Sequence, residues 1–265
     1  MPSTSQRRLF LKQSLSLCLL WGWGAANSEV TTTGVSAPQR VLFVGNSYFY
    51  YNNSLHNHVR RLVAADQPAL AHKLQYKSAT IGGATLAHHN IDWLTRPGQI
   101  GVKDPFEWVI LAGNSGDAFS EKGRTAFRQT VIEFNQIIRQ RGGKTALYMT
   151  PAYVKPHKNL APDNLQKIQE MYVSVAAEIN AQVIPVGLAF EQAYRQHPEL
   201  KLHDAEDGSH PSMAGTYLAA CTVFAQLYGR SPVGNTYTAY GQIDAHTALQ
   251  LQQIAQDVVT RQAGR

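Results

Sequence analysis

Short apolar segments alternate with longer amphipathic ones along most of this chain, and that alternation limits the folds it can adopt. The short segments have the composition of buried strands; they span residues 41–44, 74–81, 108–111, 145–149 and 183–186. Helical spacing marks five longer segments, at residues 55–65, 125–141, 164–180, 211–228 and 245–261. We therefore expect an α/β protein, a three-layer α/β/α sandwich around a five-stranded parallel sheet with right-handed crossovers.

The first residues are expected to be an export signal that is not part of this fold. Residues 1–26 combine a charged start, an apolar run and a small-residue end. The pair Arg7-Arg8, followed by Phe-Leu-Lys, resembles a twin-arginine signal, so the expected partner during export is the twin-arginine translocation machinery. The expected location is periplasmic or secreted, in a bacterium. The apolar run is shorter than the roughly 20 residues that span a bilayer, so no stable membrane anchor is expected.

Composition changes after this signal. Residues 27–39 are rich in Thr, Ser, Gly and Pro and are expected to form a flexible leader, whereas residues 40–265 are expected to form one domain. The formal net charge of +6 falls to +3 without residues 1–26, which carry three basic side chains and no acidic one. Such a balance, with no basic run, argues against a nucleic-acid partner. The two cysteines are too few for a disulfide scaffold or a four-thiolate zinc site.

Small and polar residues directly follow the first three predicted strands. These residues are Ser47, Gly82, Gly83, Asn114 and Ser115. The carboxyl ends of parallel strands meet at one edge of a sheet, where ligands bind in folds of this class. We therefore expect these residues to gather around one site.

A serine, an aspartate and a histidine in this chain have the chemistry of a catalytic triad. A serine hydroxyl is a weak nucleophile that needs an imidazole as base and an acid that orients the imidazole. Ser47 lies on the turn after the first strand, and the spacing from Asp207 to His210 lets the carboxylate reach the ring. We predict these three as the catalytic residues, with no cofactor and no metal. Pro211 favours a helix that begins directly after His210.

Three blocks of this sequence resemble the SGNH hydrolases, also called the GDSL esterase/lipase superfamily, over roughly residues 40–228. The blocks are Val41-Leu42-Phe43-Val44-Gly45-Asn46-Ser47-Tyr48, Ile81-Gly82-Gly83-Ala84-Thr85-Leu86 and Asp207-Gly208-Ser209-His210-Pro211-Ser212-Met213-Ala214-Gly215. The resemblance implies the flavodoxin-like SGNH hydrolase fold. It also implies an oxyanion hole made by the backbone N–H of Ser47, a glycine N–H of the second block and an asparagine amide. We choose Gly82 or Gly83, with a slight preference for Gly83.

The third block departs from the family pattern, Gly-x-Asn-Asp. This chain has Ala112-Gly113-Asn114-Ser115-Gly116-Asp117 instead. Alignment on Gly113 puts Ser115 in the asparagine position, whereas a shift by one residue makes Asn114 the oxyanion donor. We favour Asn114 because an amide N–H is the group that the site needs, although a serine hydroxyl is also a donor.

Together these features predict an exported serine esterase that hydrolyses acetyl or other short-chain esters through an acyl-serine intermediate. The expected substrate is a small-molecule or polysaccharide ester, carbohydrate esters included. A lipid or thioester acyl hydrolase is the next choice of hydrolase. Two rival classes stay open: an SGNH-type O-acyltransferase acting on a polysaccharide, and a catalytically silent carbohydrate-binding relative. The aromatic run at residues 48–51 either lines the site or packs the helix start, and the sequence favours neither.

Overall fold

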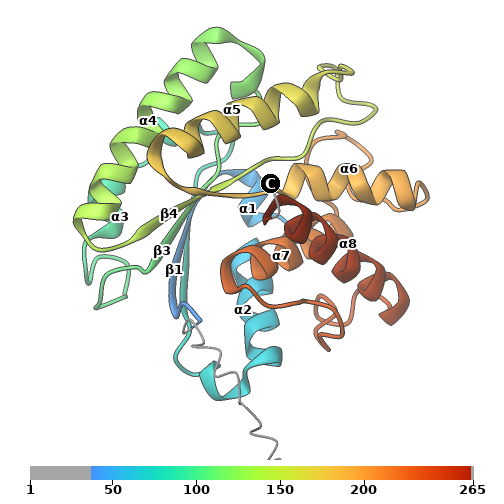
Figure 1. Ribbon diagram of the computed structural model, residues 1–265, viewed down its shortest axis with the longest axis horizontal. Coiled ribbons are helices and arrows are strands. Elements are labelled where there is room, and N and C mark those ends of the chain that lie inside the picture. The colour runs from blue at the N-terminus through green and yellow to red at the C-terminus, as the bar shows by residue number, and fades with distance from the viewer. Residues whose placement is uncertain (1–36, 264–265) are drawn as a thin grey trace, which may run out of the picture. The chain divides into compact units, whose positions relative to one another are not determined.

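The computed structural model describes residues 37–263, which form a three-layer α/β/α sandwich around one parallel sheet (Figure 1). The strands are β1 (Arg40–Gly45), β2 (Gln75–Thr80), β3 (Trp108–Leu111), β4 (Lys144–Tyr148) and β5 (Gln182–Ile184). Their order across the sheet is β2-β1-β3-β4-β5, and all four pairings are parallel. This is the flavodoxin-like order, so the predicted fold class is confirmed.

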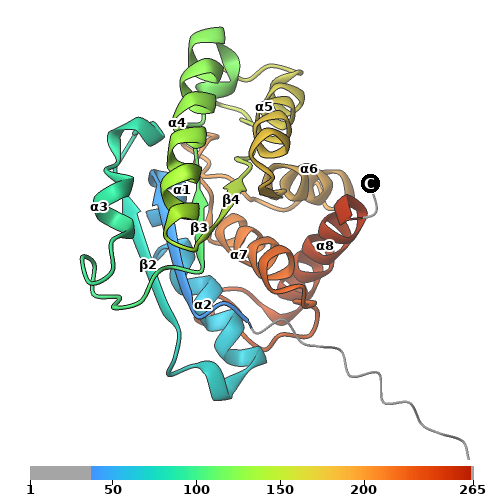
Figure 2. The same cartoon turned by 60° about the vertical axis from the view of Figure 1, so that its left-hand side comes forward.

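Helices cover both faces of the sheet, which explains why the central strands are continuous apolar runs. The helices are α1 (Ser47–Tyr50), α2 (Leu55–Asp66), α3 (Ile91–Thr95), α4 (Glu121–Gln140), α5 (Asn164–Ile179), α6 (Val186–Gln196), α7 (Met213–Tyr228) and α8 (Ala245–Ala263). In β1, Val41 and Phe43 pack into the core that contains α2 and α7, whereas Leu42 and Val44 pack into the core under α4 and α5. Figure 2 shows these two layers on opposite sides of the strands.

Helix α6 is the largest difference from the predicted elements. The sequence indicated a strand over residues 183–186, but β5 ends at Ile184 and Val186 already belongs to α6. The carbonyl of Pro185 accepts a hydrogen bond from the N–H of Ala189 at 3.0 Å, which closes the first turn of this helix. Proline is therefore the point at which the extended chain turns into a helix, and not part of a longer strand.

Helix α7 begins later than predicted. Pro211 lies outside the helix and forms an isolated antiparallel bridge with His203. The helix starts at Met213 because Ser212 caps it: the Ser212 hydroxyl accepts a hydrogen bond from the N–H of Gly215 at 3.1 Å. His210 consequently lies on the loop before the helix, separated from the first helical residue by Pro211 and Ser212.

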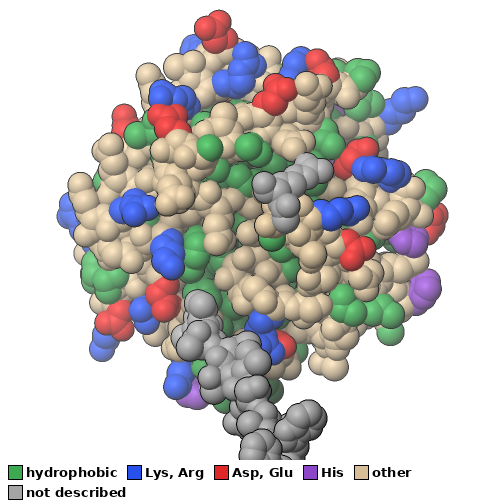
Figure 3. All heavy atoms as spheres, viewed as in Figure 1, with side chains coloured by type: hydrophobic (Ala, Val, Ile, Leu, Met, Phe, Trp, Pro, Cys, Tyr) green, Lys and Arg blue, Asp and Glu red, His purple; other side chains and the backbone are tan. Residues whose placement is uncertain are grey.

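The predicted export signal, residues 1–26, and most of the predicted leader, residues 27–39, lie outside the described residues. Ala37 and Pro38 are buried, and the N–H of Gln39 donates to Glu107 Oε2 at 2.6 Å, so the last residues of that leader pack on the domain. No helix between residues 37 and 263 combines the length and apolar character needed to cross a membrane. Acidic and basic side chains are interspersed over the face drawn in Figure 3.

Candidate active site

The turn after β1 is held by the buried side chain of Asn46. Its Oδ1 accepts a hydrogen bond from the N–H of Tyr48 at 3.3 Å and so caps the one-turn helix α1. Its Nδ2 donates to the carbonyls of Ala84 at 3.2 Å and Gly113 at 2.9 Å. Asn46 therefore joins the loops that follow β1, β2 and β3, and it presents Ser47 at their junction. Sequence analysis gave Asn46 no role, because its contacts with Ala84 and Gly113 join segments that are 38 and 67 residues away in the chain.

The loop that carries Asp207 and His210 is preorganised by its own backbone. The N–H groups of Ser209 and His210 donate to Asp207 Oδ1 at 2.7 and 2.9 Å. Gly208 has φ = +63°, and a Cβ there would lie 2.3 Å from the carbonyl oxygen of Val154, so the close approach requires glycine. This packing leaves Asp207 Oδ2 free to face the imidazole, 2.5 Å from His210 Nδ1.

The charge state of Asp207 follows from the same contacts. Burial pushes the pKa of this carboxyl up, but the hydrogen bonds from the His210 ring and from two backbone N–H groups outweigh burial and hold the pKa below its usual value. The carboxylate is therefore ionised at neutral pH and accepts a hydrogen bond from the Nδ1–H of His210.

Ser47 and His210 meet at the carboxyl edge of the sheet. His210 Nε2 lies 2.7 Å from Ser47 Oγ, although 163 residues separate the two in sequence. With Asp207 on the other side of the ring, the three residues form one hydrogen-bonded chain from hydroxyl to carboxylate. This geometry lets a proton pass from the hydroxyl to the ring.

The serine hydroxyl faces a cleft of about 280 Å³. The lining residues are Asn46, Ser47, Tyr48, Tyr50, Tyr51, Gly82, Gly83, Asn114, Ser115, Ser209 and His210. Within residues 37–263, the backbone N–H groups of Ser47, Gly82 and Gly83 make no hydrogen bond to another residue. All three donors are thus available at the wall of the cleft that also holds the Ser47 hydroxyl.

A model of the GDSL-like Lipase/Acylhydrolase family matches residues 32–218, which is well over half of the chain. The chain belongs to this family. It is accordingly a serine hydrolase that acts on ester bonds, as the sequence blocks predicted. No curated protein matches the sequence.

Solved structures with the same fold share little sequence with this chain. A DUF4886 family protein from Bacteroides uniformis is 19% identical with a TM-score of 0.62, covering 83% of this chain and 94% of its own. An acetylxylan esterase from Geobacillus stearothermophilus is 17% identical with a TM-score of 0.55, covering 76% and 98%. A lipase/acylhydrolase from Enterococcus faecalis is 20% identical with a TM-score of 0.53, covering 72% and 96%. These likenesses establish the fold.

The third block of this family member is built around Asn114. Its Nδ2 donates to the carbonyl of Gly83 at 2.8 Å, its Oδ1 accepts from the N–H of Gly116 at 3.0 Å, and its own N–H donates to Asp117 Oδ2 at 2.8 Å. The neighbouring Ser115 hydroxyl accepts a hydrogen bond from the Tyr153 hydroxyl at 2.9 Å. Both side chains that the sequence left open as oxyanion donors therefore line the cleft, and each is already held by a partner.

Asp117 is a buried carboxyl next to this block. Burial raises the pKa of Asp117 from 3.8 to about 6, and the hydrogen bond from the Asn114 N–H opposes part of that rise. Within the described residues Asp117 forms no hydrogen bond or ion pair with His210. Its carboxyl holds the loop after β3 by accepting the hydrogen bond from the Asn114 N–H, and it is not a second acid for the imidazole.

The aromatic run at residues 48–51 divides between the two roles that the sequence left open. Phe49 is fully buried in the core, and Tyr48 is buried with its hydroxyl 2.9 Å from Ser209 Oγ. Tyr51 stacks on the His210 ring, with ring centroids 4.2 Å apart and planes 5° apart. Tyr50 stacks on Tyr51 at 5.5 Å and is 42% exposed. Phe49 therefore packs the helix start, whereas Tyr48, Tyr50 and Tyr51 line the cleft.

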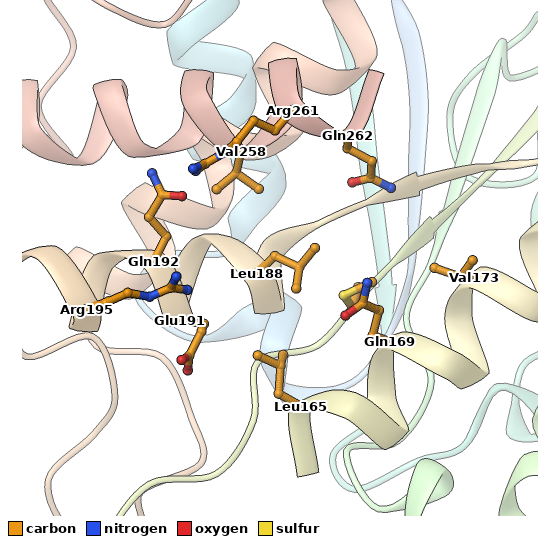
Figure 4. Close-up of a pocket in the computed structure, with 11 residues that line it drawn as sticks. Leu165, Gln169, Val173, Leu188, Glu191, Gln192, Arg195, Val258, Arg261 and Gln262 are labelled. Carbon is orange, nitrogen blue, oxygen red and sulfur yellow. The ribbon is translucent and has the colours of Figure 1, made fainter. Parts of the chain in front are cut away.

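A larger hollow of about 590 Å³ lies between α5, α6 and α8 (Figure 4). Its lining residues are Met149, Leu165, Gln169, Val173, Leu188, Glu191, Gln192, Arg195, Val258, Arg261 and Gln262. These residues include no serine, cysteine or histidine, and Glu191 is the one carboxyl among them, so the hollow lacks the paired hydroxyl and imidazole that the cleft has. The smaller cleft is therefore the candidate active site.

Proposed function

We propose that this protein is an exported esterase that removes acetyl or other short acyl groups from esters, including esters on carbohydrates. The observation that carries the proposal is the chain of hydrogen bonds from Ser47 through His210 to Asp207 at the wall of a small cleft. A cleft of about 280 Å³ favours a short acyl group over a long one. Export by the twin-arginine pathway is part of the proposal and rests on residues 1–26.

Acylation follows from the proposed roles of the three residues. Ser47 Oγ attacks the acyl carbon while His210 Nε2 takes the hydroxyl proton, and Asp207 holds the ring through its Nδ1–H. The oxyanion that forms on the acyl oxygen accepts hydrogen bonds from the N–H of Ser47 and from Gly82 or Gly83. His210 then returns the proton to the leaving alcohol oxygen, and the acyl group remains on Ser47.

Deacylation repeats these steps with water. His210 Nε2 takes a proton from a water molecule, whose oxygen attacks the acyl carbon attached to Ser47. The same backbone donors stabilise the second oxyanion. When it collapses, His210 returns the proton to Ser47 Oγ and the carboxylic acid leaves the cleft.

Asn114 is the side-chain donor that we propose for the oxyanion hole. One hydrogen of its amide is used by the carbonyl of Gly83, which leaves the second for the acyl oxygen. The same contact ties Asn114 to the glycine block, so the side-chain and backbone donors are held together. Ser115, whose oxygen accepts from Tyr153, is the alternative donor. Gly82 and Gly83 both remain proposed backbone donors.

Carbohydrate esters are the proposed substrate class for two reasons. Tyr50 is exposed at the mouth of the cleft beside Tyr51, and exposed aromatic faces of this kind suit the apolar faces of sugar rings. In addition, one protein with the same fold is an acetylxylan esterase. The polysaccharide would lie outside the cleft, with only the acyl group entering it.

A substrate panel tests this proposal. Nitrophenyl esters of increasing chain length, acetylated xylan and acetylated peptidoglycan would be compared, with the Ser47→Ala variant as control. We expect fastest turnover of the acetate ester, release of acetate from a polysaccharide and no turnover by the variant. A preference for long-chain esters would overturn the short-acyl proposal. Acyl transfer to an added polysaccharide in place of acetate release would assign an O-acyltransferase, and absence of turnover by the folded protein would assign a binding relative.

A further inference from the structure

The His210 ring is held at its edge and on its face by different parts of the chain. Hydrogen bonds to Ser47 and Asp207 fix the two ring nitrogens. Hydrogen bonds to ring nitrogens run close to the plane of the ring, so they leave the two faces of the imidazole uncovered. Tyr51 covers one face in a near-parallel stack at 4.2 Å, and Tyr48 approaches at 5.8 Å with a tilt of 35°. The stack opposes rotation of the imidazole out of line with its two partners.

Tyr51 reaches this face because of its spacing from the nucleophile. It follows Ser47 by four residues, and its N–H donates to the carbonyl of Ser47 at 3.2 Å, which closes one helical turn. Residues four apart lie on the same side of a helix, so the nucleophile and the stacked ring project together. The one-turn helix thus supplies both the group that His210 deprotonates and the surface on which His210 rests.

The next residue, Asn52, contacts the loop at the residue that follows His210 in the sequence. Its side-chain Nδ2 donates to the carbonyl of Pro211 at 2.7 Å and to Thr216 Oγ1 at 2.8 Å. Both hydrogens of the amide are therefore used. Because Pro211 directly follows His210, and Thr216 lies in the first turn of α7, Asn52 fixes the exit of the catalytic loop relative to the helix.

Asn52 occupies a strained backbone that the surrounding structure enforces. Asn52, Asn53 and Ser54 have φ values of +51°, +68° and +64°, so three successive residues other than glycine are left-handed. The buried His58 fixes this turn: its Nε2 lies 2.6 Å from the carbonyl oxygen of Asn52, and its Nδ1 lies 2.9 Å from the Tyr237 hydroxyl. Strain retained beside a catalytic loop points to a functional use.

We infer that Tyr51 and Asn52 form a clamp that positions the imidazole of His210 between Ser47 and Asp207. The inference rests on the proposed hydrolase function. Tyr51 fixes the plane of the ring, and Asn52 fixes the loop from which the ring projects. Both are positioning residues that act through His210, so their loss lowers the rate of the chemical steps more than the affinity for substrate.

Matched variants separate the clamp from general stability. Asn52→Gly and Asn53→Gly both place glycine at a left-handed position, but only the first removes a side chain that contacts the catalytic loop; Asn53 is exposed and its side chain makes no hydrogen bond within residues 37–263. Asn52→Asp keeps the size and the tolerance for a left-handed backbone while losing the amide donors, and it serves if the glycine variant does not fold. Tyr51→Leu removes the stack, and Tyr51→Phe restores it.

The readout is the separation of kcat from KM with nitrophenyl acetate, on variants whose folding is checked by circular dichroism. We expect kcat to fall about tenfold or more in Asn52→Gly, Asn52→Asp and Tyr51→Leu, with KM changed much less. Asn53→Gly keeps the wild-type kcat, and Tyr51→Phe recovers most of it.

Unchanged kcat in the three clamp variants, while Ser47→Ala is inactive, would overturn the clamp and leave the hydrolase function intact. The same holds if Tyr51→Phe is as slow as Tyr51→Leu, because the stack would then not be the cause. Turnover by Ser47→Ala would instead overturn the proposed function. The two failures are therefore distinguishable.

Discussion

The cleft at the ends of β1 and β3 has about 280 Å³ and the hollow between α5, α6 and α8 about 590 Å³, yet only the smaller one has catalytic geometry. In the cleft, the hydroxyl, imidazole and carboxylate groups are bonded to one another in sequence. In the hollow, the buried Gln192 Nε2 and Gln262 Oε1 have no hydrogen-bond partner within the described residues. Reactivity in this protein follows preorganised hydrogen bonds and not the size of the space.

Topology explains the difference between the two regions. The cleft lies where loops from three neighbouring strands meet, and Asn46 links those loops directly. The hollow lies beside β5, which is an edge strand with a neighbour on one side only. Apart from Met149, it is lined by side chains of three helices, which need not align with one another. Convergent loops can fix several polar groups at once, whereas separate helix faces do not.

Among the variants that compare the two regions, the largest loss of kcat is expected from Asn114→Ala, which removes a polar side chain from the cleft. Loss of one oxyanion donor lowers kcat by roughly a hundredfold or more. Ser115→Ala is the matched variant, and we expect a much smaller loss because we propose the Asn114 amide as the side-chain donor. The Ser115 hydroxyl accepts from Tyr153 and keeps its own hydrogen, so the pair of variants tests this choice. Steady-state kinetics with nitrophenyl acetate measure both. A larger loss in Ser115→Ala would move the donor role from Asn114 to Ser115.

A second prediction concerns the pH dependence of stability next to the cleft. Because the pKa of Asp117 is raised from 3.8 to about 6 in the folded protein, this carboxyl stabilises the fold below about pH 4, and that contribution is lost as the pH rises through 6. Asp117→Asn keeps an acceptor for the Asn114 N–H without a buried charge. We expect the variant to match the wild type near pH 4 and to exceed it by up to about 3 kcal/mol at pH 8.

Urea unfolding at the two pH values measures this difference. The matched control is Asp244→Asn, at an exposed carboxyl whose pKa lies below its usual value, so its removal has the opposite pH trend. A difference between Asp117→Asn and wild type that does not grow with pH would contradict the burial of a charged Asp117.

The smallest effect is expected in the hollow. Gln192→Leu removes a buried amide whose Nε2 has no partner within residues 37–263, and it extends the apolar lining formed with Leu188 and Val258. We expect the free energy of unfolding to rise by about 1 kcal/mol with kcat unchanged. Thermal and urea unfolding measure the first quantity. A loss of activity would contradict the separation of the two regions.

Much of the fold could be predicted because its strands are buried on both faces and bounded by turns. The apolar run at Val41–Val44 is typical of a central strand, and it forms one. The apolar run at residues 183–186 misled, because its last residue, Val186, belongs to the following helix. The helix that begins at Val186 has buried Ala189, Phe190 and Ala193 at helical spacing, a signal that the preceding apolar run obscured. Pro185 marked the boundary between the two.

That Ser47, Asp207 and His210 lie close together was predictable to the extent that these residues follow strands or share a loop. Ser47 directly follows β1, and Asp207 and His210 are three residues apart. The support around them was not predictable, because Tyr51 and Asn52 act across a tertiary contact with residues 210–216. Only the asparagine pair at residues 52–53, a residue type that tolerates left-handed backbone, indicated an unusual turn.

Covalent labelling with a fluorophosphonate, located by mass spectrometry, tests the central claim most directly. The claim is that Ser47 is made nucleophilic by His210, 163 residues away. The account predicts one adduct, on Ser47, which is absent in Ser47→Ala and forms roughly a thousandfold more slowly in His210→Ala. An adduct on another residue, or ester hydrolysis that persists undiminished in Ser47→Ala, would contradict it.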